Sequence, residues 1–350
     1  MKHQILIYGA NGYTGKLLAR YAKLYNLVPV LAGRNETAIR SLAEELQFPY
    51  AVFSLDDEEV LKKQLEQVFI VIHAAGPFKQ TAKQMVEACI NTQTHYLDIN
   101  GDISVFEFIK QYDAAAKKAG IMLMPGTGFD VVPTDCMALQ LKELLPDATD
   151  LKLAFVPMGG SLSHGTATTM ASKLGEGGAA RINGKIANKP LGQHSMWLQF
   201  ENKKRFVMSI PWGDVSTAYF TTGIPNIETY TGVTPLTYRL LKFQFLLNWL
   251  LRTNWMRGII QNKINAAPAG PTDEQRANGS TYIWGKVSNK KGDAVIRKFV
   301  CADGYTFTVL ATLHIVKKII DGVYKPGYQT PAAVYGPGLA FEIEGTRTID

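Results

Sequence analysis

Three glycines near the start of the chain carry the clearest chemical signal. Gly9, Gly12 and Gly15 follow the apolar run 5–8 and precede residues that recur at helical spacing. A glycine turn between a strand and a helix lets backbone N–H groups approach a diphosphate, and the helix N-terminus favours its negative charge. The spacing therefore predicts a dinucleotide site rather than a plain structural turn. Its expected residues are Gly9, Asn11, Gly12, Tyr13, Thr14 and Gly15.

The end of the second apolar run, 28–32, bears on the choice between NAD and NADP. An NAD site usually places Asp or Glu there to hold the ribose hydroxyls, whereas an NADP site places arginine beside the extra phosphate. This chain has Gly33 and Arg34 at that point, and the acid Glu36 comes later. Because a guanidinium forks onto phosphate, we expect NADP (NADPH) with Arg34 at its 2′-phosphate. An ordinary surface arginine at a helix start is the alternative.

Two further places belong to the expected cofactor site. Asp56 follows the third run and lies either at the adenine edge or at a helix N-cap. Ala75, Gly76 and Pro77 close the run 68–75, where small residues let a cofactor lie across the sheet. A tight strand-to-helix turn is a second interpretation of the same residues, and the two are compatible.

Candidates for proton transfer should lie near the carboxyl ends of the strands. Tyr96 and Asp98 alternate on one expected strand, so their side chains share a face. Tyr96 is the first candidate donor, with a buried strand tyrosine as the alternative. Asp130 is a catalytic candidate whose alternative is turn or cap chemistry. The three cysteines are scattered, and no zinc motif is present, so we expect reduced thiols and no metal.

The elements that must position these residues fall into two parts. Up to about residue 135, apolar runs alternate with amphipathic stretches, which predicts an α/β fold with a Rossmann-type parallel sheet. From 151 to about 310, β-branched and aromatic runs predict a second α+β domain with a mostly antiparallel sheet. The runs read as strands are 151–157, 204–212, 216–223, 227–233, 281–288 and 294–302, and helices are expected within 163–178, 236–252 and 305–322.

The expected domains are an NADP-binding domain at 1–140 and a substrate or dimerisation domain at 150–303. The helix 305–322 and the C-terminal tail are expected to pack back on the first domain. The chain has 350 residues and a net charge of +7, without a signal-peptide pattern or an apolar run long enough to span a membrane. No Lys/Arg run of the nucleic-acid-binding kind occurs. We therefore expect a cytoplasmic protein with a small-molecule substrate and no nucleic-acid partner.

The stretch 236–260 combines positive charge with apolar side chains. It carries Arg239, Lys242, Arg252 and Arg257, and no acid occurs between Glu228 and Asp273. Such a helix can lie in a membrane interface, which predicts a peripheral membrane contact through 236–260. The alternatives are a core helix, a dimer helix, consistent with an expected homodimer, and the wall of a lipid pocket.

Several motifs together resemble the saccharopine dehydrogenase-like oxidoreductases, a group that includes trans-acting enoyl reductases. They are YGANGYTGKL, AAGPF, MVEAC, THYLDINGD and GTGFDVVPTD. The resemblance implies a Rossmann domain, an inserted α+β domain and a nicotinamide cofactor. The chain departs from the family pattern at Asn100-Gly101-Asp102, where Thr-Gly-Glu is common, and at 128–132, where saccharopine reductases carry Gly-Leu-Asp-Pro-Gly.

The sequence thus predicts an NADP-dependent oxidoreductase that reduces a hydrophobic carbonyl or enoyl substrate. One alternative is a membrane- or lipid-surface binding protein whose nucleotide site is regulatory or vestigial. The other is a saccharopine-type amino-acid dehydrogenase, which would need a polar, cationic pocket for several carboxylates.

Overall fold

A seven-stranded parallel sheet forms the centre of the first of two units. The computed structural model describes residues 4–159, 162–172, 176–201, 203–243, 249 and 253–349. The chain divides into a first unit, Met1–Val132 with Tyr305–Val334, and a second unit, Pro133–Gly304 with Tyr335–Asp350. We describe each unit by itself.

The strands of the first sheet are added on opposite sides of β1: β2 and β3 lie on one side, and β4, β5, β6 and β15 lie on the other. The order is β15-β6-β5-β4-β1-β2-β3, and every neighbouring pair is parallel. Because β1 lies between β2 and β4, a crevice opens at this switch point in folds of this order. The strands are β1 (Gln4–Tyr8), β2 (Val30–Gly33), β3 (Tyr50–Val52), β4 (Val68–His73), β5 (His95–Asp98), β6 (Met122–Met124) and β15 (Gly327–Tyr328).

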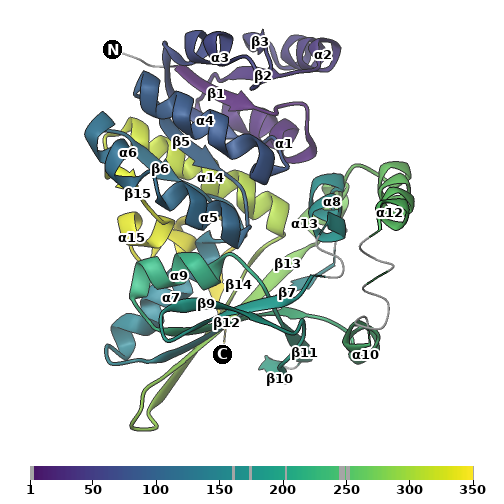
Figure 1. The fold of residues 1–350 in the computed structure, drawn as a ribbon, viewed down its shortest axis with the longest axis vertical. Helices are drawn as coiled ribbons and strands as arrows, with labels where there is room; N and C mark the ends of the chain where they lie inside the picture. The colour runs from purple at the N-terminus through teal and green to yellow at the C-terminus, as the bar shows by residue number, and fades with distance from the viewer. Residues whose placement is uncertain are drawn as a thin grey trace. The chain divides into compact units, whose positions relative to one another are not determined.

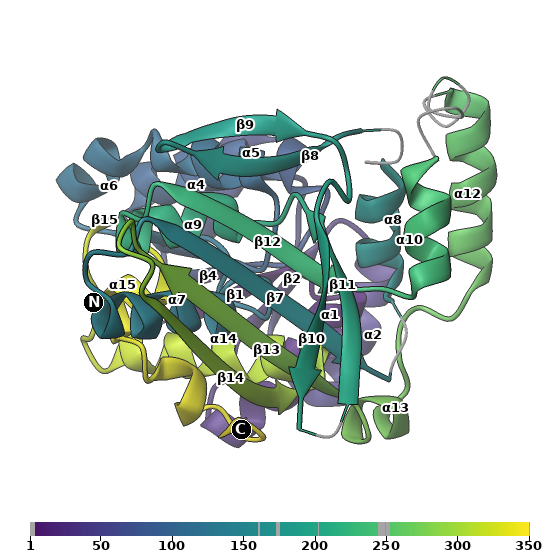
Figure 2. The same ribbon diagram turned by 90° about the horizontal axis from the view of Figure 1, so that it is seen from below.

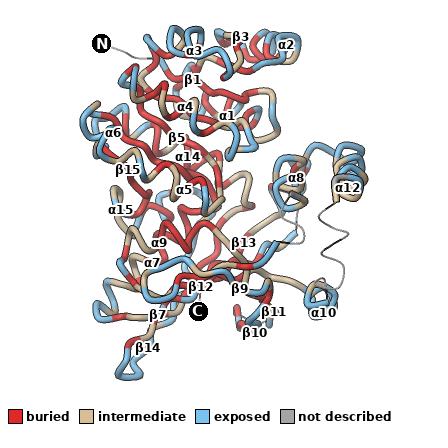
Figure 3. The backbone as a smooth tube through the Cα atoms, in the orientation of Figure 1, coloured by how far each residue is buried: buried red, intermediate tan, exposed pale blue. Residues whose placement is uncertain are grey.

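Helices cover both faces of this sheet (Figure 1). One group contains α1 and α2, and the other contains α3, α4, α5 and α6. Apart from the edge strand β3, most of the sheet is buried on both sides, as the red strands in Figure 3 show, and its strands are runs of apolar residues. The helices are α1 (Tyr13–Ala22), η1 (Lys23–Tyr25), α2 (Glu36–Leu46), α3 (Glu58–Leu65), α4 (Phe78–Thr92), α5 (Ile103–Lys110), α6 (Asp113–Ala119) and α15 (Pro331–Tyr335).

The helix α14 (Gly304–Ile320) returns to the first unit from the far end of the chain. It buries a nearly continuous apolar surface, and the Thr312 hydroxyl lies 3.1 Å from that of Thr127 after β6. A Cβ on Gly128 would lie 2.6 Å from Thr308 Cγ2, so α14 and this loop are in close contact. The predicted helix 305–322 is therefore present.

A nine-stranded, mostly antiparallel sheet forms the centre of the second unit (Figure 2). Its main order is β10-β11-β12-β7-β13-β14-β16, and the β8–β9 hairpin pairs with β12. Among the described ladders of this second sheet, only the β12–β7 pair is parallel. The strands are β7 (Asp150–Met158), β8 (Gly178–Ile182), β9 (Lys185–Lys189), β10 (Ser195–Phe200), β11 (Lys203–Ile210), β12 (Asn226–Gly232), β13 (Ser280–Ser288), β14 (Ala294–Ala302) and β16 (Arg347–Thr348).

The two faces of this second sheet are packed differently. On one face, the Met137 and Leu141 side chains of α7 fill the space over Gly285, where a Cβ would clash at 2.6 Å. On the other, Phe200 of β10 meets Tyr282 of β13 with ring centroids 5.0 Å apart, although three strands separate β10 from β13, so the sheet curls. The remaining elements are α7 (Val132–Leu144), α8 (His164–Ser172), α9 (Asp214–Thr222), α10 (Pro235–Lys242), α12 (Asn254–Ala266), α13 (Asp273–Ala277) and η3 (Leu339–Glu342).

The predicted fold class is confirmed, but the strand expected at 216–223 is wrong. These residues belong to α9, which ends at Gly223 in the left-handed conformation with φ 68°. The buried Thr222 hydroxyl donates to Ala218 O at 2.6 Å, so a carbonyl of the helix itself satisfies the hydrogen bond of this hydroxyl. Tertiary burial therefore overrides the strand propensity of the Thr and aromatic residues.

Two other expectations need correction. The tail was expected to pack on the first domain, but residues 335–350 belong to the second unit, where β16 pairs with β14. The single helix expected at 236–252 is wrong in extent, because α10 ends at Lys242. The rest of that stretch, apart from Phe243 and Trp249, lies outside the described residues.

Candidate functional site

Nearly all the predicted site residues lie at the carboxyl ends of the parallel strands. The glycine turn follows β1, Arg34 follows β2, Ala75–Pro77 follow β4, and Asp98 ends β5. Since all seven strands are parallel, these loops share one edge of the sheet. The loops after β1, β2 and β4 are also tied together, because Gly9 N donates to Ala32 O at 2.8 Å and Ala74 N donates to Tyr8 O at 2.8 Å.

The reason for glycine differs among the three positions of the turn. Gly9 has φ +84°, and a Cβ there would lie 2.8 Å from the Ala75 backbone nitrogen. A Cβ on Gly15 would overlap the carbonyl oxygen of Gly9. Gly12 differs, because its φ of −72° suits any residue and the only atom near an added Cβ is Gly9 O at 3.3 Å. The fold therefore requires Gly9 and Gly15, whereas at Gly12 it leaves space beside the backbone.

That space lies at an uncapped helix start. Gly12 is the N-cap of α1 and contributes no side-chain hydrogen bond, and the first turn holds no acidic residue. The first N–H groups of a helix have no intrahelical acceptor, and the macrodipole places partial positive charge there. A diphosphate supplies the acceptors and the negative charge that this turn lacks. The residues present thus fit the pyrophosphate of a dinucleotide.

The end of β2 supplies a cation. Arg34 is exposed, and within the described part of the chain its guanidinium forms no hydrogen bond or ion pair. The later acid Glu36 is engaged along its own helix, where it accepts from Arg40 at 2.6 Å. A Cβ on Gly33 would lie 3.0 Å from Asn11 Oδ1, so Gly33 makes room for the Asn11 side chain. This edge therefore presents Arg34 and no ribose-binding acid.

Asp56 lies near this cation but does not cap a helix. The N-cap of α3 is Asp57, whose side chain accepts from Val60 N, so the N-cap interpretation of Asp56 is wrong. Asp56 is exposed and accepts from the Ser54 hydroxyl at 3.0 Å. Burial raises the pKa of Tyr8, while the charge of Arg34 lowers this pKa and that of Asp56 raises it. The adenine-edge role of Asp56 stays a prediction.

The loop after β4 is linked by hydrogen bonds to a buried histidine, His73. His73 Nε2 lies 2.9 Å from Thr81 Oγ1, and the same hydroxyl lies 2.8 Å from Ala75 O. The His73 side chain is fully buried, and burial lowers its pKa to about 3, so it is neutral. The rings of Tyr8, Phe78 and Tyr96 surround it. No motif signals this residue, because its partner Thr81 lies on the next helix.

Tyr96 and Asp98 meet on one face of β5, as the alternation predicted. The Tyr96 hydroxyl donates to Asp98 Oδ2 at 2.7 Å, and both side chains are fully buried. Asp98 Oδ1 accepts from Asn100 N at 3.0 Å and from Gly126 N at 2.8 Å. Burial raises the pKa of Asp98 despite these bonds, and it raises that of Tyr96 well above its usual 10. Asp98 thereby links the loops after β5 and β6. The bonds from Asn100 and Gly126 could not be predicted from the sequence.

Asp130 lies beside the same loops. A Cβ on Gly101 would lie 2.5 Å from Asp130 Oδ2, so this carboxylate fits against the backbone after β5. Asp130 is half-buried and precedes α7. Asp130 is thus more exposed than Tyr96, whose hydroxyl is buried against Asp98, and its catalytic role stays a prediction.

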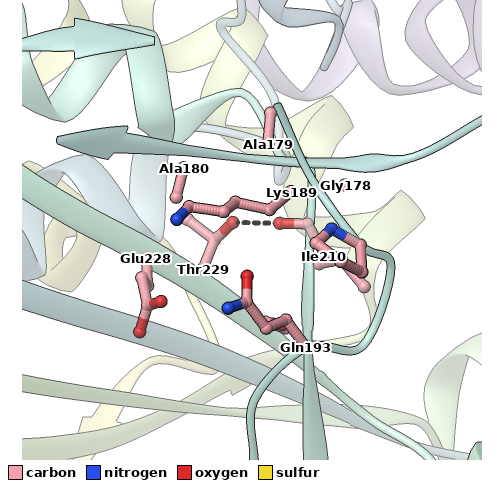
Figure 4. Close-up of a pocket in the computed structure, with 10 residues that line it drawn as sticks. Gly178, Ala179, Ala180, Lys189, Gln193, Ile210, Glu228 and Thr229 are labelled. Atoms are coloured by element: carbon pink, nitrogen blue, oxygen red, sulfur yellow. Dashed lines mark hydrogen bonds between the residues drawn. The ribbon is translucent and has the colours of Figure 1, made fainter. Parts of the chain in front are cut away.

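The second unit has a small hollow of its own (Figure 4). Lys189, Gln193 and Glu228 line it, together with residues of β8 and β11. The Glu228 carboxylate is already engaged there, since His194 Nδ1 and the Tyr230 hydroxyl each lie 2.6 Å from it.

Large apolar side chains are exposed on α10. Leu236, Leu240 and Phe243 are 66%, 67% and 62% exposed and recur at i, i+4 and i+7, so they share one face. The opposite side of the helix packs inward, where Tyr238 contacts Phe206 of β11. Trp255 of α12 is exposed as well. Of the helices in the described ranges, none has the length and hydropathy needed to cross a bilayer.

The strand order, the glycine turn and the uncapped α1 define a Rossmann-type nucleotide-binding unit. Residues 5–124 match the model of the saccharopine dehydrogenase NADP binding domain. This confirms the resemblance expected from the motifs, and the matched segment is an NADP-binding domain.

Named relatives agree with this assignment over part of the chain. A lipid droplet localized protein of Caenorhabditis elegans is 28% identical over 198 residues, which are 51% of this chain and 46% of that protein. A trans-acting enoyl reductase of Mycobacterium leprae is 28% identical over 154 residues, 41% of this chain and 37% of the relative. The matches thus span less than half the length of these two curated relatives.

A solved structure matches the whole chain. Saccharopine dehydrogenase (L-Glu forming) from Saccharomyces cerevisiae aligns with a TM-score of 0.68 and 12% identity over 99% of this chain and 100% of that one. At this identity, the likeness establishes the fold.

Proposed function

We propose that the protein is an NADPH-dependent oxidoreductase that reduces a hydrophobic carbonyl or enoyl substrate. The observation that carries the cofactor choice is Arg34, an exposed guanidinium without an ion pair in the described part of the chain, at the end of β2. When bound, NADPH supplies a hydride to the substrate. The trans-acting enoyl reductase among the relatives supports the substrate class. The role of 150–303 as the substrate or dimerisation domain is part of this proposal.

Different residues of the chain are proposed to bind different parts of the cofactor. The first-turn N–H groups after Gly12 bind the pyrophosphate, and Arg34 binds the 2′-phosphate. Asp98 holds the loops after β5 and β6, because its carboxylate accepts from both of them. We assign Tyr96 a positioning role with Asp98, since its buried hydroxyl is occupied by that carboxylate. Asp130 is then the candidate for proton transfer at the sheet edge.

Replacing Arg34 by alanine tests the cofactor choice. Loss of a charge-assisted pair should weaken NADPH binding by about 1.5–3 kcal/mol, roughly 10- to 150-fold, and leave NADH binding nearly unchanged. Fluorescence titration of both cofactors against both proteins measures this. Arg40→Ala is the matched control, because Arg40 is an exposed arginine of the same region that is paired with Glu36. An equal loss for NADH would remove Arg34 from the 2′-phosphate site.

The substrate class is tested by oxidation of NADPH with medium- and long-chain enoyl thioesters and aldehydes. Saccharopine with NADP⁺ is the competing substrate for the amino-acid alternative. Turnover of the apolar substrates alone would support the proposal, and turnover of saccharopine alone would replace it.

We also propose a second role, contact with an anionic lipid surface through α10. The exposed face of Leu236, Leu240 and Phe243 supports it, and the same helix carries Arg239 and Lys242. Apolar insertion and attraction of basic residues to anionic lipid act together in interfacial helices. A homodimer through this face is the competing arrangement.

Flotation with neutral and anionic vesicles separates these two arrangements. Leu240→Glu should abolish flotation with anionic vesicles and leave the molecular mass by light scattering unchanged. Arg239→Glu with Lys242→Glu should weaken anionic binding by about 1 kcal/mol for each basic residue removed, roughly fivefold each. Leu24→Glu is the control, because Leu24 is equally exposed but lies in the first unit. If the protein floats with neither vesicle and Leu240→Glu halves its mass, α10 is a dimer interface. Arg252 of the original basic set lies outside the described residues.

A further inference from the structure

A hydrogen-bonded chain connects the interior of the sheet to the loop after β4. Thr81 Oγ1 lies 2.8 Å from Ala75 O and 2.9 Å from His73 Nε2. A hydroxyl has one proton, and a carbonyl oxygen can only accept, so Thr81 donates to Ala75 O, with Pro77 O as a more distant acceptor at 3.3 Å. The hydroxyl oxygen must then accept from His73 Nε2–H. This fixes the tautomer of His73, with the proton on Nε2.

The other ring nitrogen agrees with this tautomer. His73 Nδ1 is buried and has no hydrogen-bond partner among the described residues. In the assigned tautomer, Nδ1 carries a lone pair and no proton, surrounded by the rings of Tyr8, Phe78 and Tyr96. Burial of His73 with one unsatisfied nitrogen destabilises the folded state. This cost suggests that its one hydrogen bond, to Thr81, has a role beyond stability.

Through Thr81, this bond reaches the loop 74–77, which lies against the glycine turn. Ala75 lies so near the glycine turn that a Cβ on Gly9 would be 2.8 Å from both Ala75 N and Ala75 Cβ. A small shift of Ala75 would therefore either push into the turn or open a gap beside it. Thr81 holds the Ala75 carbonyl through its hydroxyl, and His73 holds that hydroxyl in turn.

We propose that His73 and Thr81 are positioning residues that set the loop 74–77 for the nicotinamide half of the cofactor. This inference rests on the proposed NADPH site. In sheets of this order the adenosine half lies over β2 and β3, and the dinucleotide crosses at the switch point toward β4. The loop after β4 therefore belongs to the nicotinamide side, whereas Arg34 belongs to the adenosine side.

Because the cofactor has an adenosine half and a nicotinamide half, a ligand with only the adenosine half serves as an internal control. NADPH and 2′,5′-ADP share the phosphorylated adenosine, but only NADPH carries nicotinamide. Thr81→Val should weaken NADPH binding about three- to tenfold, the worth of one hydrogen bond, and leave 2′,5′-ADP binding unchanged. Thr81→Ser keeps the hydroxyl and should bind NADPH within about twofold of the unmodified protein. Arg34→Ala should instead weaken both ligands.

A matched variant on the same helix controls for stability. The Thr92 hydroxyl of α4 is buried, whereas that of Thr81 is half-buried, and it donates to Ala88 O at 2.8 Å, far along the helix from Ala75. Thr92→Val should lower thermal stability to a similar degree as Thr81→Val without changing NADPH affinity. Nitrogen NMR of His73 should show the Nε2–H tautomer in the unmodified protein.

The outcomes separate the two proposals. If the unmodified protein binds both ligands and Thr81→Val binds NADPH with full affinity, the positioning role is wrong and the cofactor site stands. Equal weakening of NADPH and 2′,5′-ADP by Thr81→Val, or an Nδ1–H tautomer, would also overturn it. If the unmodified protein binds neither ligand, the proposed function itself fails.

Discussion

Replacement of Gly12 by valine is expected to abolish NADPH binding in a protein that still folds. The φ of Gly12 suits any residue, and an added Cβ approaches only Gly9 O, at 3.3 Å. The valine side chain therefore extends into the space where backbone and pyrophosphate should meet. NADPH affinity should fall about 100-fold or more, which is about 2.7 kcal/mol. Valine is a poorer N-cap than glycine, so the free energy of unfolding should fall by only about 1 kcal/mol.

Gly15→Ala is the contrasting variant. Its new methyl group would overlap the carbonyl oxygen of Gly9, so its main effect should be on stability, with about 1–3 kcal/mol lost. Cofactor titration and urea unfolding of both variants measure the two effects separately. Full NADPH affinity in Gly12→Val would mean that the pyrophosphate lies elsewhere.

The free energy of unfolding is expected to fall steeply as the pH is lowered from 7.5 to 4.5. Burial lowers the pKa of His73 to about 3 and that of His95 to about 4, against about 6.5 in the unfolded chain. The unfolded state therefore binds more protons between these values, and stability is lost as the pH falls below 6.5. At pH 4.5, two units below the unfolded pKa, each histidine costs about 2–3 kcal/mol, or about 5 kcal/mol together.

Both histidines have structural reasons to stay neutral. His95 Nδ1 accepts from Met122 N at 2.9 Å, which requires that nitrogen to be unprotonated, and His73 lies among aromatic rings. Urea unfolding of the double variant His73→Gln, His95→Gln should show a pH dependence that is shallower by about 5 kcal/mol over this range. Each single variant should remove about half of that difference. A double variant with the same pH dependence as the unmodified protein would contradict the assigned neutral state.

Local patterns predicted the parts of the site that depend on backbone geometry. The glycine spacing, the helical periodicity after it and Arg34 beyond the second run are all read within 35 residues. Tyr96 and Asp98 were paired correctly because side chains two apart on a strand share a face. The shared carboxyl edge of the strands follows from the βαβ alternation, which predicts a parallel sheet. The order of the strands does not follow from this alternation and comes from the structure.

Other features depend on partners that local patterns do not connect. The His73–Thr81–Ala75 chain and the bond from Gly126 N to Asp98 exist only once the strands and helices are assembled. The α9 helix was read as a strand because its Thr and aromatic residues favour strands in isolation. The β8–β9 hairpin was missed although Asn183-Gly184 at its tip has positive φ at both residues, the turn such hairpins prefer.

Titration of the unmodified protein with NADPH and NADH under identical conditions tests the central claim most directly. Because Arg34 is exposed without an ion pair in the described part of the chain and Glu36 is held by Arg40, NADPH should bind at least about tenfold more tightly than NADH. Equal affinities, tighter binding of NADH, or binding of neither cofactor would contradict an NADPH-dependent oxidoreductase.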